Sequence, residues 1–301
     1  MAVNGRGWWA VALVVVLALV AVSPEVDART GDPVEVSLLI DHRPAEEGER
    51  REVVAQRRAN INERVATRLE ERLDAIGVRY SEVDIDEDHT VTVKVYGDFD
   101  DAVIRGAIIP RGKMELRRVR VEDSPWAEVA AELPDQVQYQ SPGSGLFRTD
   151  WLYLTAPSPS LLAEAIDTWG PSDEDIRIFP QDQGFRTVRL GETVATESHV
   201  ESASLGRSPA GDPRIAIRLK SAIAHEALDR RGEAGLLAMV LDEEVVALIP
   251  TRRYHRSLTF DLEPPPHLNS PEAKQAWGMQ VAGRLSTPMP IRLVELDELQ
   301  R

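Results

Sequence analysis

The chain has 301 residues, 43% hydrophobic and 28% charged, a composition typical of a globular protein and too apolar for a disordered one. Its formal net charge of −15 disfavours nucleic acid and anionic lipid as partners, because both are negatively charged. Cysteine is absent, which excludes disulfides, thiolate nucleophiles and cysteine-based metal sites, and the length predicts two domains.

The N-terminal residues have the layout of an export signal. Arg6 precedes an apolar run over residues 8–22, which is followed by Pro24 and by the small residues Val26 and Ala28. This order predicts a signal peptide over residues 1–28 that is cleaved after Ala28. The alternative is a retained membrane anchor, although a helix over the apolar run would be only about 22 Å long. We expect an exported protein of a bacterial envelope, either periplasmic or attached by residues 8–22 to the outer side of the inner membrane.

The next part of the chain predicts a base domain over residues 33–137. Alternating apolar residues predict strands, and apolar residues three or four apart predict helices. Gly77 lies where the cap of the first long helix is expected. The predicted elements are strand 34–40, helix 49–76, strands 80–85 and 90–96, helix 99–109 and strand 114–121. This βαββαβ order is that of a ferredoxin-like unit, an antiparallel sheet with both helices on one face.

Residues 138–211 have a weaker pattern, and we interpret them as a linker or insert. A tract rich in Ser, Pro, Gly and Gln over residues 138–145 marks the expected domain boundary. Beyond it, short apolar runs predict strands 151–154, 176–179 and 187–190 and a helix over 161–169.

Residues 212–301 predict a second α+β domain. Its expected elements are strand 215–219, helix 221–231, strands 236–241 and 244–249, strand 258–262, helix 270–285 and strand 291–294. We interpret Asp242 as a turn residue between two of these strands and Pro250 as a structural residue at the end of the second. The predicted fold class is therefore α+β, with a ferredoxin-like base and a second, head-like domain.

Several short motifs in the two predicted domains resemble one known family. Residues 71–78 read ERLDAIGV and residues 114–119 read MELRRV; residues 237–242 read LAMVLD, and residues 272–295 end in PMPIRLVE. These stretches resemble the periplasmic base and head of SecD, a subunit of the bacterial protein-export machinery. The resemblance implies a protein that handles polypeptide outside the cytoplasm.

The sequence also departs from the SecD pattern. Glu243 stands where the family has the glycine of an Asp-Gly turn, and Leu248 and Ile249 replace Ser-Ala before Pro250. In SecD the proton-coupled work resides in membrane helices that follow the periplasmic region, and no such helices follow here. The resemblance thus implies the polypeptide-handling exterior without the motor.

No residue pattern predicts catalysis, a cofactor or a metal. The alternating aspartates of residues 84–88 have the oxygen spacing of a calcium loop, but His89 stands where glycine is needed and Val95 where a bidentate carboxylate is needed. The six histidines lack zinc-binding spacings, and Ser144 lies outside any nucleophile elbow. We therefore expect a solvated hairpin turn at 84–88 and a protein that is not an enzyme.

Three residues near the end of strand 244–249 are candidates for polypeptide contact. Leu248, Ile249 and Tyr254 could line an apolar groove, or a free sheet edge could accept a strand; the alternative is that they belong to the core. The expected function is binding of unfolded polypeptide or of a Sec translocase component, as an accessory to protein export. Two other hypotheses are a scaffold subunit of an unrelated envelope complex and a hydrolase with an unrecognised site.

Overall fold

The computed structural model describes residues 33–120, 125–140, 153–172, 174–181, 183–220, 236–250 and 259–296. The predicted signal or anchor segment, the predicted helix 221–231, Ser144 and Tyr254 lie outside these residues. Within the described ranges, no helix combines the length and the apolarity needed to cross a bilayer. The described elements form an α+β fold with three antiparallel sheets.

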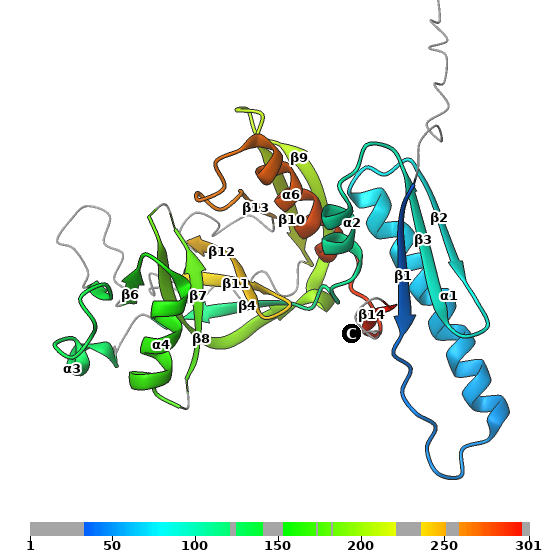
Figure 1. Cartoon of the computed structure of the whole chain (residues 1–301), viewed down its shortest axis with the longest axis horizontal. Coiled ribbons are helices and arrows are strands. Elements are labelled where there is room, and N and C mark those ends of the chain that lie inside the picture. The colour runs from blue at the N-terminus through cyan, green and yellow to red at the C-terminus, as the bar shows by residue number, and fades with distance from the viewer. Residues whose placement is uncertain are drawn as a thin grey trace, which may run out of the picture.

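A four-stranded sheet forms the base at one end of the molecule (Figure 1). Its strand order is β14-β1-β3-β2, and all neighbours are antiparallel. The strands are β1 (Val34–Ile40), β2 (Tyr80–Ile85), β3 (Thr90–Tyr96) and β14 (Leu293–Glu295). The last strand of the chain therefore lies beside the first strand that the structure describes.

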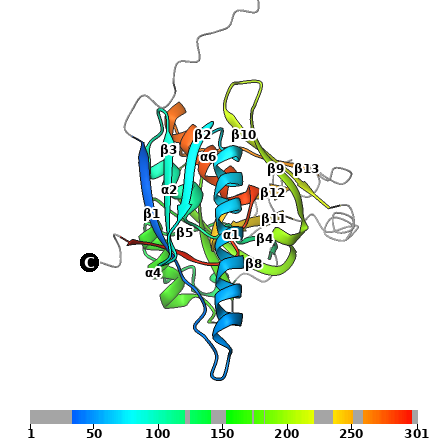
Figure 2. The ribbon, with the colours of Figure 1, turned by 90° about the vertical axis from the view of Figure 1, so that its right-hand side faces the viewer.

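Helices α1 (Arg51–Ala75) and α2 (Asp101–Ile108) cover one face of the base sheet, and α6 (Pro271–Ser286) packs against these two helices. Figure 2 shows α1 running along the sheet. Alternate residues of β1 and β3 point into the core beneath these helices, among them Val36, Leu38 and Val93. The apolar pattern that predicted the strands therefore also fixes which face is covered.

The C-terminus of α1 ends at a left-handed glycine. Gly77 has φ +86°, and its N–H donates to Asp74 O at 3.0 Å while the N–H of Val78 donates to Leu73 O at 3.0 Å. This pair of hydrogen bonds is the Schellman arrangement, which favours glycine because a side chain would be strained at that φ. At the start of α6, Ser270 Oγ accepts from Ala273 N at 3.0 Å.

A seven-stranded sheet and a three-stranded sheet make up the rest of the molecule. The large sheet has the order β12-β11-β4-β8-β6-β5, with β7 also pairing β8. Its strands are β4 (Met114–Val119), β5 (Gln138–Gln140), β6 (Tyr153–Ala156), β7 (Asp175–Pro180), β8 (Phe185–Thr196), β11 (Leu236–Leu241) and β12 (Glu244–Pro250). The sheet thus combines strands from all three predicted ranges, so its pairing crosses the predicted boundaries at 138 and 212.

The small sheet has the order β13-β10-β9. Its strands are β9 (Val200–Arg207), β10 (Pro213–Leu219) and β13 (Thr259–Leu262). The chain passes from β8 through the short helix η1 (Glu197–His199) directly into β9, so the two sheets are joined on that side. A shared core fills the space between them, with Leu116, Ile217 and Phe260 fully buried. Helices α3 (Trp126–Val129) and α4 (Pro159–Trp169) enclose a smaller core around Trp126.

One prediction about the base sheet is wrong. Strand 114–121 was expected to close it, but β4 pairs with β11 and β8 in the large sheet, and β14 takes the edge place beside β1. The alternation of Met114 and Leu116 correctly indicates a strand with a buried face. It could not indicate which sheet buries that face, because partner choice depends on residues more than a hundred positions away.

Candidate functional site

An apolar groove lies where the two sheets are not joined. Within the described residues, β12 pairs with β11 and β13 pairs with β10, so each strand lies at the edge of its sheet. Residues from these two strands line the groove. A strand at the edge of a sheet can pair through its backbone with another extended chain.

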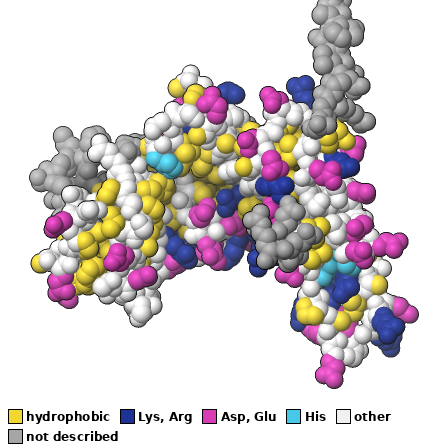
Figure 3. Space-filling model, viewed as in Figure 1, with side chains coloured by type: hydrophobic (Ala, Val, Ile, Leu, Met, Phe, Trp, Pro, Cys, Tyr) yellow, Lys and Arg dark blue, Asp and Glu magenta, His cyan; other side chains and the backbone are white. Residues whose placement is uncertain are grey.

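The groove has a volume of about 460 Å³. Hydrophobic side chains gather over this part of the molecule, around the hollow beside β7 and β12 (Figure 3). We call the site the apolar groove and define it by its lining: Phe179, Arg186, Arg214, residues 246–250 and residues 261–266.

Two of the three predicted contact residues lie in the apolar groove. Leu248 is half-buried and packs beside the core that contains Val245, whereas Ile249 is only 4% exposed and belongs to the core between the sheets. The pairing of β12 with β11 is irregular at Val246, so Val246 and Ile249 face one core while Val245 and Leu248 face another. Leu248 is therefore the more accessible of the two, and Pro250 is exposed at the end of the strand.

The opposite wall of the apolar groove is stiff. Pro264, Pro265 and Pro266 follow β13, and proline fixes φ and has no N–H to donate. A wall of this kind presents apolar surface with little conformational entropy to lose when a ligand binds.

Three of the four charged side chains in the described groove lining are paired or shielded, and the fourth, Glu263, is exposed. Arg214 forms an ion pair with Asp261 across β10 and β13. Arg186 lies between two aromatic rings, with its guanidinium carbon 5.3 Å from the Phe179 centroid and 5.7 Å from the Tyr153 centroid. Burial lowers the pKa of Arg186, and an interaction with Tyr153 opposes that shift. The groove lining is therefore mainly apolar, with Glu263 as an exposed charged group at its side.

A second feature, the polar junction cluster, connects the base to the large sheet. It consists of Arg72 on α1, Asp242 in the β11–β12 turn and Arg284 on α6, together with the backbone of Gly112 and Lys113. The Asp242 carboxylate accepts from Gly112 N at 3.1 Å, Lys113 N at 2.9 Å and Arg284 Nε at 3.0 Å. Asp242, interpreted from the sequence as a turn residue, also has φ +49°.

Arg72 is fully buried in the junction cluster. Its Nε donates to Thr287 O at 2.7 Å, and its Nη atoms donate to Ile108 O at 2.9 Å and Arg111 O at 2.8 Å. Burial lowers the pKa of Arg72 to about 9, and the nearby Asp242 carboxylate opposes that shift, so the group is protonated at neutral pH. The cation satisfies carbonyls at the C-terminal ends of two helices, where the helix dipole is negative.

The helical spacing of the sequence indicates that Arg72 is buried, although its charge is typical of an exposed residue. Arg72 follows Val65 by seven residues and Leu69 by three, so it lies on the buried face of α1. Its charge suggested the opposite, solvated face. A cation at a core position is a candidate for capping helix ends elsewhere in the fold.

Other candidate chemistry is placed as follows. Asp86 accepts from Thr90 N at 2.8 Å in the β2–β3 turn, as a turn residue would. His89 has φ +65°, and its ring centroid lies 4.6 Å from that of His42. Among the described residues, no group of three or more His, Asp or Glu is arranged to hold a metal ion.

The two motif-bearing stretches lie side by side in the large sheet. In β4 and β11, Leu237 is opposite Arg118 and Leu241 is opposite Met114, although more than a hundred residues separate them. Comparison with solved structures finds similarity to SecDF.

Three SecDF structures are among those similar to this chain. A crystal structure of SecDF in a super-membrane-facing form is 16% identical, over 88% of this chain and 30% of that chain, with a TM-score of 0.49. A structure described as a membrane component SecDF that enhances protein export is 18% identical, over 87% of this chain and 97% of that chain, with a TM-score of 0.46. SecDF from Thermus thermophilus, a translocon-associated membrane protein, is 14% identical, over 88% and 30%, with a TM-score of 0.29.

This chain therefore spans 30% of the length of two of these SecDF chains. No protein-family model and no curated protein sequence matches it.

Proposed function

We propose that this chain is an exported, non-enzymatic protein of the bacterial envelope that binds extended polypeptide in the apolar groove and assists protein export. The observation that carries the proposal is that the groove lies beside the edge strands β12 and β13 of two sheets and has a mainly apolar lining. An extended polypeptide can hydrogen-bond to a free edge through its backbone while its apolar side chains enter a neighbouring groove.

The proposed cellular role is inferred from the resemblance to SecD. The motifs of β4, β11 and β12 support a SecD-like role, with a Sec translocase component as a further partner. In this proposal, residues 8–22 direct export as a signal or hold the protein at the inner membrane as an anchor. In this proposal the base is a ferredoxin-like unit with β14 as its fourth strand. In the sequence, β14 follows all the strands of the other two sheets.

Peptide binding to a groove variant tests the proposal. We expect a fluorescein-labelled peptide rich in Leu and Val, with prolines to prevent helix formation, to bind the purified chain in a fluorescence-anisotropy titration. Leu248→Asp puts a carboxylate on the groove wall and should raise Kd about tenfold, which corresponds to about 1.4 kcal/mol. Near-UV circular dichroism checks that the variant is folded.

The matched control is Val53→Asp on α1, where the side chain is 52% exposed. It introduces the same carboxylate at an exposed apolar position in the base and should leave Kd unchanged. A peptide that does not bind, or equal binding by Leu248→Asp and the unmodified chain, would contradict the proposal.

Cross-linking in an envelope fraction tests the cellular setting. We expect recovery of export-machinery subunits or unfolded precursor chains. A stoichiometric partner unrelated to export would instead select the scaffold hypothesis. The mass of the chain in that fraction distinguishes a cleaved signal peptide from a retained anchor.

A further inference from the structure

A second cavity, with a different chemistry, lies on the far side of the β7–β8 hairpin from the apolar groove. Its volume is about 530 Å³, and the ten lining residues that the structure describes include no Asp, Glu, Lys, Arg or His. We call it the amide pocket, because five of the nine glutamines in the chain line it: Gln136, Gln138, Gln140, Gln181 and Gln183. These side chains offer hydrogen-bonding groups without charge, which suits a ligand with uncharged donors and acceptors.

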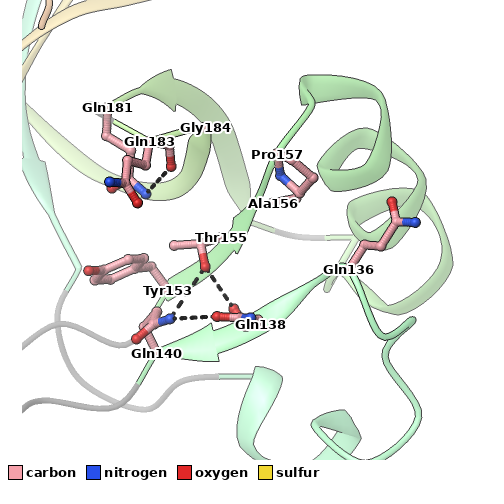
Figure 4. Close-up of a pocket in the computed structure, with 10 residues that line it drawn as sticks. All are labelled: Gln136, Gln138, Gln140, Tyr153, Thr155, Ala156, Pro157, Gln181, Gln183 and Gly184. Atoms are coloured by element: carbon pink, nitrogen blue, oxygen red, sulfur yellow. Dashed lines mark hydrogen bonds between the residues drawn. The ribbon is translucent and has the colours of Figure 1, made fainter. Parts of the chain in front are cut away.

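Four of the five glutamines of the amide pocket come from two hairpins that face each other, and Gln136 precedes β5 (Figure 4). Gln138 and Gln140 lie two apart on β5 and therefore share one face of the strand. Across the pairing with β6, Gln138 is opposite Thr155 and Gln140 is opposite Tyr153. Gln181 and Gln183 come from the β7–β8 turn on the other side. Amide groups thus line the pocket from both sides.

The hydrogen bonds that these glutamine side chains form are long. Gln140 Nε2 donates to Gln138 Oε1 and to Thr155 Oγ1, each at 3.4 Å, and Gln181 Nε2 donates to Gln183 O at 3.4 Å. Strong N–H···O bonds are about 2.9 Å long, so these contacts can be exchanged for better ones at little cost. Each glutamine amide has two donor hydrogens and an acceptor oxygen, which is the hydrogen-bonding complement of a peptide group.

A third hollow of about 450 Å³ shares lining residues with both the amide pocket and the apolar groove. Gln181 and Gln183 line both the amide pocket and this hollow, whereas Phe179, Arg186 and Pro266 line both the hollow and the groove. The three spaces are therefore neighbours, and one extended chain could lie across all of them. At the pocket end, β5 is the edge strand of the described sheet.

We propose that the amide pocket is a second subsite and binds the backbone of the polypeptide whose apolar residues occupy the groove. This inference rests on the proposed function of the groove. Side-chain amides can pair with the C=O and N–H of any residue, so this subsite accepts varied sequences beyond the apolar anchor. A neutral oligosaccharide could use the same amides, but the neighbouring apolar groove favours a polypeptide.

Three labelled peptides test the proposal on the unmodified chain by fluorescence anisotropy. The first is an apolar anchor alone, the second carries a Gly-Ser extension, and the third carries the same extension with N-methylated backbone amides. We expect the extension to lower Kd about tenfold and N-methylation to abolish that gain, because it removes backbone donors. A Gln-Thr extension should give the same gain as Gly-Ser.

A pocket variant provides the second arm of the test. The double variant Gln138→Ala with Gln140→Ala should abolish the gain from the extension and leave the Kd of the anchor unchanged. Gln56→Ala, at an exposed position of α1, is the matched control and should change neither value.

The outcomes separate the two proposals. If the anchor binds but the extension adds nothing, or N-methylation has no effect, the amide pocket is not a backbone subsite and the groove proposal survives. If no peptide binds, both proposals fail. If maltotriose, and not the peptide extension, shifts the side-chain amide NMR signals of these glutamines, the pocket binds a neutral glycan and the polypeptide inference is overturned.

Discussion

The junction cluster predicts that Arg72 contributes more to stability than any exposed arginine. In Arg72→Ala, the carbonyls of Ile108, Arg111 and Thr287 lose a buried, charged donor. A hydrogen bond to a charged group contributes about 1.5–3 kcal/mol, and removing one partner of a buried charged network costs about 3–5 kcal/mol in total, because such bonds are not additive. We therefore expect the free energy of unfolding to fall by about 4 kcal/mol.

Urea unfolding followed by circular dichroism and tryptophan fluorescence measures this loss. Arg72→Lys should recover about half of it, because lysine keeps the charge but replaces the planar guanidinium fork by a single nitrogen. The control is Arg68→Ala, one turn earlier on α1, where an exposed arginine pairs with Glu71 at 2.8 Å. Exposed pairs contribute about 1 kcal/mol or less. Equal losses for Arg72→Ala and Arg68→Ala would refute the reasoning.

Three further predictions concern turns and titrating groups. Glu243 has φ +74° in the β11–β12 turn, so Glu243→Gly should raise the free energy of unfolding by about 0.5 kcal/mol by relieving backbone strain. Asp242→Ala should lower it by about 3 kcal/mol, because two backbone donors and Arg284 lose their shared acceptor. Burial lowers the pKa of His42, and the neighbouring His89 lowers it further. The unfolded chain then binds more protons than the folded chain below about pH 6.5, so stability should fall as the pH is lowered through that value, and His42→Gln should flatten the dependence.

Each of these predictions has a direct check. The urea midpoint reports the two turn variants, and Glu244→Gly, in the adjacent strand position, should not share the gain of Glu243→Gly. For the histidine, the midpoint is measured between pH 5 and pH 8. An unchanged slope in His42→Gln, or the same flattening in a variant of the exposed His267, would show that His42 is not the group responsible.

Local patterns in the sequence determined most of the elements. The spacing of Val65 and Leu69 indicated α1, and Gly77 and Ser270 lie at the ends of helices in the structure. Two strands escaped prediction for a physical reason. β5 has three polar or amphipathic residues in a tract typical of a linker, and β9 alternates small and polar residues rather than large apolar ones. Neither carries the periodicity of a half-buried strand.

The functional surfaces were only partly predictable. The sequence indicated Leu248 as a contact candidate because it lies near the end of an apolar strand. The amide pocket could not, because Gln138 and Gln181 belong to segments that appear in the sequence as unrelated loops. The sequence analysis placed Arg72 only within the motif of residues 71–78, and its buried position appears in the structure.

The sequence by itself determined the fold class, the SecD resemblance and the local conformation of most segments. Only the tertiary structure decided that β14 rather than β4 closes the base sheet, and that the glutamines of two hairpins share one pocket. The reason is physical: periodicity and capping act over a few residues, whereas strand pairing is selected by the burial of surfaces from distant parts of the chain.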